Sequence, residues 1–342
     1  MSERAAAGGR AVTLALDAEG GDHAPGEIVA GALAAASPDL RVLLVGRPEM
    51  IEPHLAGADT RHVEIVPSGA GISSLEEPAR AVRSKRDSSI VVGARTVVEG
   101  RAEGFVSAGS TGAMLAVGLL VVKRVPGVKR PAIVTVLPGG EAPVVFLDAG
   151  ANADCRPEHL LEFGILGSIF ARRALGLREP RVGLLNIGEE PTKGNELALG
   201  AYSLLADPAG GLRFVGNVEG RDLLFNKADV VVTDGFTGNV ALKLLEGTAR
   251  ALLLRVRDAA RRDVRSKIGG LLLRPSLTRV RAVLDPEEYG GTCLLGVQGL
   301  MIICHGNSSR RAVANALRFG AEAARRGLVQ TVQEELGRGG GR

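Results

Sequence analysis

The 342-residue chain is poor in aromatic side chains, which make up 3% of it, and it has no tryptophan. This composition argues against base stacking on aromatic platforms, and we expect no nucleic-acid partner. Cysteine is scarce as well: Cys155, Cys293 and Cys304 are odd in number and show no CxxC spacing. This usage predicts a reduced, cytoplasmic protein rather than a disulfide-bonded one.

Several catalytic motifs are missing. The sequence contains no Gly-x-Ser-x-Gly, no Gly-Lys dipeptide, no HExxH and no Cys/His cluster at metal-ligand spacing. Their absence argues against a hydrolase nucleophile elbow, an NTPase phosphate loop and a zinc site. We therefore expect an enzyme that works without a metal or a cofactor.

Long hydrophobic runs are also lacking. Residues 104–122 carry no charge, but their first half is rich in Ser, Gly and Thr. This pattern predicts a glycine loop followed by a buried helix rather than a membrane span. Residues 1–10 have no apolar segment of the kind that a signal peptide needs.

Glycine is abundant, with 47 residues, and many glycines follow short β-branched runs. Alternation of such runs with Ala/Leu-rich helical stretches predicts an α/β fold with a doubly wound, largely parallel sheet. The expected strands are 12–16, 42–45, 63–66, 104–107, 133–136, 144–147, 182–187, 214–218, 230–233 and 300–304. The expected helices are 25–36, 78–85, 112–123, 157–173, 195–205, 239–258 and 311–326.

No long polar linker divides the chain. We therefore expect one catalytic domain over residues 11–334, with disordered tails at 1–10 and 335–342. Residues 241–285 depart from the alternating pattern and predict a protruding helical segment. Between Arg255 and Arg281 stand nine Lys or Arg against two Asp, a local charge of +7 compared with +4 for the whole chain. This basic segment predicts contact with an acidic partner, an anionic surface or a second subunit.

Polar residues and glycines follow the apolar runs at several places, beginning with Asp17-Ala-Glu-Gly-Gly-Asp-His23. In a parallel sheet, such ends gather at the carboxyl edge where ligands bind. Ser107-Ala-Gly-Ser-Thr-Gly112 lies between a strand and a helix, so its backbone N–H groups are suited to a phosphate. The candidate binding residues at these ends are Asp17, Gly20, Gly21, Asp22, Ser107, Gly109, Ser110, Thr111, Gly112, Asn152, Asn186, Asn195, Asn217, Asp234, Thr237, Gly238 and Asn239.

Three residues are candidates for a catalytic role. Lys193 stands beside Gly194 and Asn195 after an expected strand, where it can meet a phosphate oxygen or a developing oxyanion. His23 and His305 lie in polar loops, and either can act as acid, base or phosphate donor. Asn239 is also placed to cap the helix that follows it.

Together these motifs resemble one family, the acyl-acyl-carrier-protein:phosphate acyltransferases of bacterial phospholipid synthesis, known as PlsX. Two departures are Glu19, where the resemblance leads us to expect Met, and Glu189-Glu-Pro-Thr192, where we expect a run richer in acids and lysine. The matching stretches run in family order: 17–25, 77–83, 107–112, 147–152, 181–187, 193–197, 214–218, 230–239 and 289–291.

The resemblance implies that an acyl-carrier-protein thioester and inorganic phosphate give acyl phosphate and free carrier protein. It also implies a fold similar to phosphotransacetylases and isocitrate/isopropylmalate dehydrogenases, a homodimer, and peripheral association with an anionic membrane surface. The product would pass to a membrane-bound glycerol-3-phosphate acyltransferase. Under this hypothesis Lys193 and the 107–112 loop hold phosphate and oxyanion, and His23 or His305 orients phosphate or protonates the leaving thiolate.

Three other functions are open on the sequence. A phosphotransacetylase-like enzyme acting on short acyl-coenzyme A is the main alternative, because it shares the implied fold. A dehydrogenase lacks the expected metal-binding aspartates and nucleotide loop. A non-catalytic sensor of acyl or phosphate ligands would need fewer polar strand ends than this chain carries.

Overall fold

The computed structural model describes residues 10–73, 75–284 and 290–337, apart from the side chains of residues 279–284. Its strands form one eleven-stranded sheet, in the order β3 (Val63–Pro67), β2 (Leu40–Gly46), β1 (Val12–Asp17), β4 (Gly104–Ser107), β11 (Leu300–Ile303), β10 (Thr292–Leu295), β5 (Ala132–Leu137), β6 (Val144–Leu147), β9 (Val230–Val232), β7 (Arg181–Asn186) and β8 (Arg213–Glu219). Seven strand pairings are parallel and three are antiparallel. The predicted α/β fold with a largely parallel sheet is confirmed.

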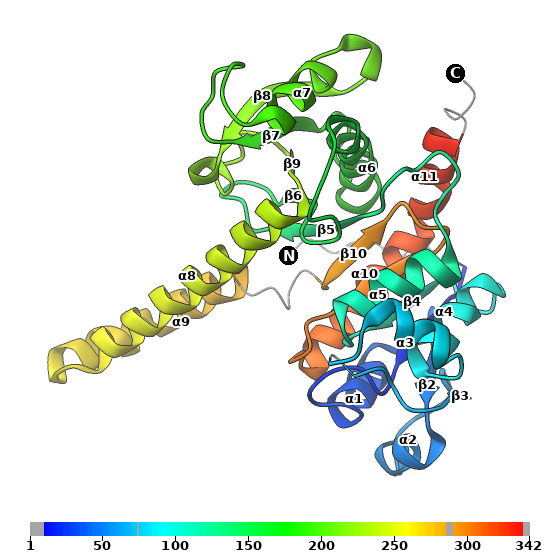
Figure 1. Ribbon diagram of the computed structural model, residues 1–342. Helices are drawn as coiled ribbons and strands as arrows, with labels where there is room; N and C mark the ends of the chain where they lie inside the picture. Colours follow the sequence, from blue (N-terminus) through cyan, green and yellow to red (C-terminus); the bar gives the residue numbers. More distant parts are fainter. Residues whose placement is uncertain (1–9, 74, 285–289, 338–342) are drawn as a thin grey trace.

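The sheet has two lobes (Figure 1). The first lobe holds β1–β4 and β11, the second holds β6–β9, and β10 and β5 join them. Residues 138–143 connect β5 to β6 through only six residues, and such a short connection makes the pair an antiparallel hairpin. The parallel strands of the second lobe therefore run opposite to those of the first.

Helices cover both faces of the sheet. In the first lobe, α3 (Pro78–Ser84), α4 (Ser89–Val98) and α5 (Thr111–Val117) pack on the face to which Ala15 and Phe105 point. The opposite face is covered by α1 (Gly26–Ala35), α6 (Pro157–Leu175), α7 (Glu196–Leu205), α10 (Arg310–Arg325) and α11 (Leu328–Gly337). The remaining short helices are α2 (Pro48–Leu55), η1 (Gly118–Val122), η2 (Pro208–Gly210) and η3 (Gly220–Asp222).

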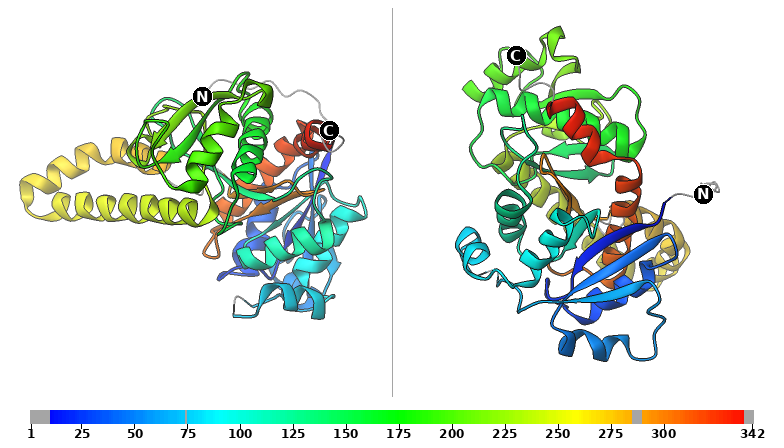
Figure 2. Two further views of the ribbon diagram at one scale, coloured as in Figure 1. Left: turned by 45° about the horizontal axis from the view of Figure 1, so that its top comes forward. Right: turned by 90° about the vertical axis from the view of Figure 1, so that its right-hand side faces the viewer.

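A helical hairpin projects from the body, as predicted. It consists of α8 (Gly235–Arg261) and α9 (Val264–Leu284), which lie side by side (Figures 1 and 2). The base of α8 packs on Phe146 and Val231 in the second lobe, and the rest extends away from the body. The predicted segment began at residue 241, six residues too late.

The ends of the chain differ in part from expectation. Residues 335–337 form the last turn of α11, so the predicted tail from residue 335 is wrong at its start. Residues 1–9 and 338–342 lie outside the described residues, and the single catalytic domain stays a prediction. Among the described residues, no helix is long and apolar enough to span a membrane.

Candidate active site

A buried carboxylate ties together two loops of the first lobe. Asp17, which ends β1, is 2% exposed, and its Oδ2 accepts a hydrogen bond of 2.7 Å from Ser107 Oγ at the end of β4. Ser107 Oγ in turn accepts from the Gly109 N–H at 3.0 Å. Gly20 lies so close above them that a Cβ there would be 2.6 Å from Asp17 Oδ2. Burial raises the pKa of Asp17, and these residues build the loop edge rather than face a ligand.

The loop after β11 also joins this edge, so the two candidate histidines lie on neighbouring loops. The Asp22 N–H donates to Gly306 O at 2.6 Å. Gly21 has a φ of +103°, and a Cβ there would lie 3.0 Å from the same oxygen, so the close approach requires glycine. His23 and His305 are both exposed.

Helix α5 starts at the same edge, with Ser110 as its N-cap and no side chain bonded to its first turn. Uncapped N–H groups at a helix start are donors for an anion. Thr111 is exposed there. The predicted helix over 112–123 is confirmed, but its second half, η1, is a π-helix.

In the second lobe, Asp148 organises the loop that follows β6. It is fully buried, and its two oxygens accept from the N–H groups of Ile133, Gly150, Ala151 and Asn152 and from Asn152 Nδ2, at 2.7–3.1 Å. Burial raises the pKa of Asp148, and these bonds act in the opposite direction. Asn152 Nδ2 also donates to Pro131 O, so this candidate binding residue is occupied in holding the loop.

The start of α8 docks on this loop. Asp234 is the N-cap, since its side chain accepts from the Thr237 N–H at 2.8 Å and from Thr237 Oγ1 at 2.7 Å. The expectation that Asn239 caps this helix is wrong, because the helix begins four residues earlier. Asn239 Nδ2 instead donates to Ala149 O at 3.1 Å. Gly238 lies directly against Asp148 O, where no larger residue fits.

Three asparagines hold the loop that carries Lys193 and the start of the helix after it. Asn217 is 2% exposed, and its Nδ2 donates to Glu190 O at 2.8 Å, the oxygen that also accepts the Lys193 N–H. Asn186 Nδ2 donates to Lys193 O at 3.0 Å, and Asn195 caps α7 through the Ala198 N–H. The backbone of Lys193 is thus held from both sides while its side chain is exposed.

Helix α8 connects the two lobes over its first three turns. Asn239 bonds the loop after β6, and Leu242 packs against apolar clusters of both lobes. One turn further on, Glu246 Oε1 lies 3.6 Å from His305 Nε2. The cluster that Leu242 contacts also contains Ala149 and, from α5, Met114. The α5 start, the loop after β6 and the α8 base therefore border one region between the lobes.

The cysteines offer no reactive thiol. Burial raises the pKa of Cys155 to about 11, and those of Cys293 and Cys304 to about 12. Thiols with such pKa values are protonated near neutral pH and are poor nucleophiles. Within the described part of the chain, no three His, Cys, Asp or Glu side chains are grouped as a metal site.

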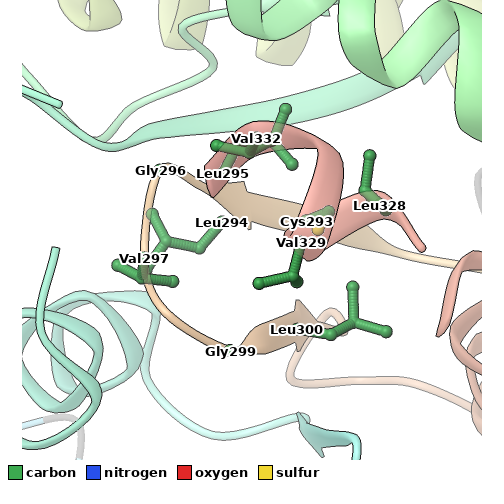
Figure 3. Close-up of a pocket in the computed structure, with 10 residues that line it drawn as sticks. All are labelled: Cys293, Leu294, Leu295, Gly296, Val297, Gly299, Leu300, Leu328, Val329 and Val332. Carbon is green, nitrogen blue, oxygen red and sulfur yellow. The ribbon is translucent and has the colours of Figure 1, made fainter. Parts of the chain in front are cut away.

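A small cavity beside α11 is not a second site. It is lined by backbone and apolar side chains of β10, β11 and α11, including Leu300 and Val332, and holds about 10 Å³ (Figure 3). That is at or below the volume needed for one water molecule. It is a packing gap in the core.

Comparison with known proteins gives a full-length match. The profile of the family described as "Fatty acid synthesis protein" matches residues 12–331. A phosphate acyltransferase of Heliobacterium modesticaldum is 50% identical over 328 residues, which cover 94% of this chain and 97% of the relative. One from Desulfitobacterium hafniense is 48% identical, with 95% and 98% covered. The chain belongs to this family.

Solved structures similar to this phosphate acyltransferase family member support the fold alone. The phosphotransacetylase EutD of Staphylococcus aureus superposes with a TM-score of 0.61 at 18% identity, covering 92% of this chain and 94% of the other. A 4-hydroxythreonine-4-phosphate dehydrogenase of Klebsiella pneumoniae gives 0.54 at 13% identity, covering 94% and 99%. The resemblance to the PlsX family is confirmed, and so is the expected likeness to phosphotransacetylases.

The structure groups the predicted residues in three sets. Asp17–His23, Ser107–Gly112 and His305 meet at the first-lobe edge, and Asn152 and Asp234–Asn239 meet at the second. Lys193, with Asn186, Asn195 and Asn217, lies on the β7–β8 side of the second lobe. Two residues were missed: Asp148, a strand-end acid signalled by its position, and Glu246, which a helical sequence does not distinguish from a surface residue.

Proposed function

We propose that this chain transfers an acyl group from an acyl-carrier-protein thioester to inorganic phosphate. The observation that supports the proposal most strongly is the full-length match to relatives named phosphate acyltransferase. In the proposed reaction a phosphate oxygen attacks the thioester carbonyl, the C–S bond breaks, and the thiolate leaves and takes up a proton. The products are acyl phosphate and the free carrier thiol.

The chemistry fits a site that has no activated nucleophile of its own. Phosphate is already nucleophilic at neutral pH, so the protein has to position it and to stabilise the charge that grows on the carbonyl oxygen. The uncapped N–H groups at the start of α5 are suited to hold phosphate. We assign charge neutralisation to Lys193, whose backbone is fixed by Asn186 and Asn217.

Of the two histidines, His305 is the stronger candidate for protonating the leaving thiolate. Its Nε2 lies 3.6 Å from Glu246 Oε1, and this carboxylate is placed to orient the imidazole. His23 lies on the adjoining loop and remains the candidate for orienting phosphate. His305→Asn should lower kcat more than His23→Asn does, and the reverse order would exchange the two roles.

The protruding hairpin is proposed to serve interactions. Ile268, Leu272 and Leu273 on α9 are 58%, 75% and 57% exposed, beside a strongly basic surface. Apolar side chains flanked by arginines suit an anionic membrane surface, and a homodimer and delivery of product to a membrane-bound glycerol-3-phosphate acyltransferase belong to the same proposal. Changing Ile268 and Leu272 to Asp should abolish co-sedimentation with anionic vesicles. Unchanged sedimentation would remove the membrane role.

The catalytic proposal is tested by trapping the product. Purified protein is incubated with long-chain acyl-carrier protein and phosphate, and acyl phosphate is captured with hydroxylamine, with short acyl-coenzyme A in parallel. Phosphate-dependent hydroxamate from the carrier substrate is the expected result. Product from short acyl-coenzyme A alone would favour the phosphotransacetylase-like alternative. If neither substrate gave product, the remaining hypothesis would be a non-catalytic sensor of acyl or phosphate ligands.

A further inference from the structure

A large groove runs along the helical hairpin to the first-lobe edge. Its volume is about 1650 Å³, and its walls are α8, α9, the end of β5 and the loop after β11. Most of its lining surface is apolar, contributed by leucines such as Leu245 near the base and Leu253 further along α8. His305 and Ser308 line the same groove, so it opens directly onto the candidate site.

Helix α8 has one broad face toward the groove and one narrow face away from it. Ala249, Leu253 and Val256 line the groove, and all three are half-buried. Lys243, Gly247, Ala251 and Arg255 do not line it, and their spacing of four places them together on the opposite face. Ala249 and Ala251 are thus the same residue type on opposite faces of one helix.

Charge is distributed unevenly along the groove. Glu246 is the one acid among the residues that line it, and it faces His305 at the base. Five cationic residues line the rest, and four of them lie in the half nearer the tip: Arg257, Arg261, Lys267 and Arg274. The cationic side chains thus gather toward the tip, whereas the base is apolar and ends at the strand edge.

We infer that this groove receives the acyl chain of the thioester substrate. In this arrangement the thioester carbonyl lies beside His305, and the acyl chain runs from it along α8 past Leu245 and Leu253. The carrier protein is joined to the same carbonyl through sulfur, so it docks at the base end of the groove. The inference rests on the proposed acyl transfer to phosphate and adds where the chain lies. Ala249 and Leu253 then determine which chain lengths are accepted.

The test compares two tryptophan variants. Ala249→Trp narrows the groove, whereas Ala251→Trp places the same side chain on the opposite face. We measure kcat/KM with palmitoyl- and butyryl-carrier protein for both. Ala249→Trp should lower the palmitoyl value by about 10-fold or more, the scale on which apolar pockets discriminate chain length, and leave the butyryl value within about 2-fold. Ala251→Trp should change neither.

Further measurements separate the outcomes. If thermal unfolding shows that Ala249→Trp is misfolded, Leu253→Ala replaces it and should raise KM for the palmitoyl substrate alone. An unchanged chain-length profile in a folded variant would overturn the inference and leave the proposed function intact. A changed assembly mass by light scattering with an unchanged profile would assign the groove to a second copy. Wild-type protein inactive with every chain length would overturn the proposed function and the inference together.

Discussion

At the edge of the first lobe, Asp17 accepts from the Ser107 hydroxyl and from one backbone N–H, that of Glu19, and the backbone N–H groups at the start of α5 have no side-chain cap. At the edge of the second lobe, Asp148, Asn186 and Asn217 bond to backbone groups of the loops around them. The first lobe therefore presents backbone donors, and the second presents the side chain of Lys193. Most polar residues at the strand ends build these two edges and leave few groups for chemistry.

The largest difference between the lobes should appear in the free energy of unfolding when the buried aspartate of each edge is replaced by asparagine. Both oxygens of Asp148 accept from N–H donors, so an amide NH₂ must meet at least one donor. Asp148→Asn should destabilise the protein by about 2–5 kcal/mol, because each buried donor without an acceptor costs about 1–3 kcal/mol.

Asp17→Asn is the matched variant in the first lobe. Its Oδ2 meets a hydroxyl, which can accept from an amide, and the substitution removes a buried charge. Its effect should be within about 1 kcal/mol, which is small for a buried site. Urea unfolding measures both variants, and equal losses would contradict the comparison.

The next largest effect should be the loss of activity when the exposed cation Lys193 is removed. Lys193→Ala should lower kcat by about 10²–10³-fold, as expected when one donor to a developing oxyanion is lost. Thermal unfolding should be unchanged, because the side chain is exposed. Near-normal turnover at low phosphate would show that Lys193 has no part in the reaction.

An ion pair in the first lobe gives a smaller, pH-dependent effect. Glu19 and Arg47 are bonded at 2.8 Å, with their side chains 8% and 39% exposed. Arg47→Met strands a buried carboxylate and should cost about 1–3 kcal/mol, whereas Glu19→Met frees an arginine that can turn to solvent and should cost less. Equal costs, measured by urea unfolding at pH 7, would contradict this asymmetry.

The sign of the pH dependence follows from Glu19. Burial acts to raise the pKa of Glu19, but the hydrogen bonds from Arg47 outweigh it, and the pKa lies below its usual value. A lowered pKa contributes stability that is present above the unfolded-state value of about 4.3 and is lost as the pH falls through the folded-state value. The difference between wild type and Arg47→Met should therefore shrink on acidification. A constant difference would argue against the pair as its source.

The smallest effect on activity is expected when the support of the Lys193 loop by Asn217 is removed. Asn217→Ala removes a bond to Glu190 O and lets the loop shift. We expect a loss in kcat of about 10-fold, less than the about 10²-fold that a misplacement of 1 Å can cause. The double variant with Lys193→Ala should be no slower than Lys193→Ala alone. An additive loss would show that Asn217 acts independently of Lys193.

Much of the fold is readable from the sequence because the buried strands are short runs rich in Val, Ile and Leu. Ten of the strands lie where these runs predict them. Strand β10 (Thr292–Leu295) was missed because it is antiparallel to both of its neighbours, β11 and β5, and so falls outside the alternation of strands and helices. The reversal of the second lobe was also missed, because it depends on the length of the 138–143 connection rather than on any strand pattern.

The sequence predicts which residues lie at the candidate site, but not which of them hold the loops and which are free to contact a substrate. Position after a strand marks Asp17, Asn186 and Asn217 as edge residues, but only the pairing of neighbouring loops shows that each already has a partner. The contact of Glu246 with His305 depends on where α8 crosses between the lobes. No local pattern encodes that crossing.

The central claim is that the protein positions phosphate for direct attack and supplies no nucleophile of its own. It is tested most directly by the intact mass of the protein after incubation with palmitoyl-carrier protein, without and then with phosphate. The account predicts an unmodified protein in both samples, with the carrier deacylated only when phosphate is added. An acyl adduct on the protein in the sample without phosphate would contradict it.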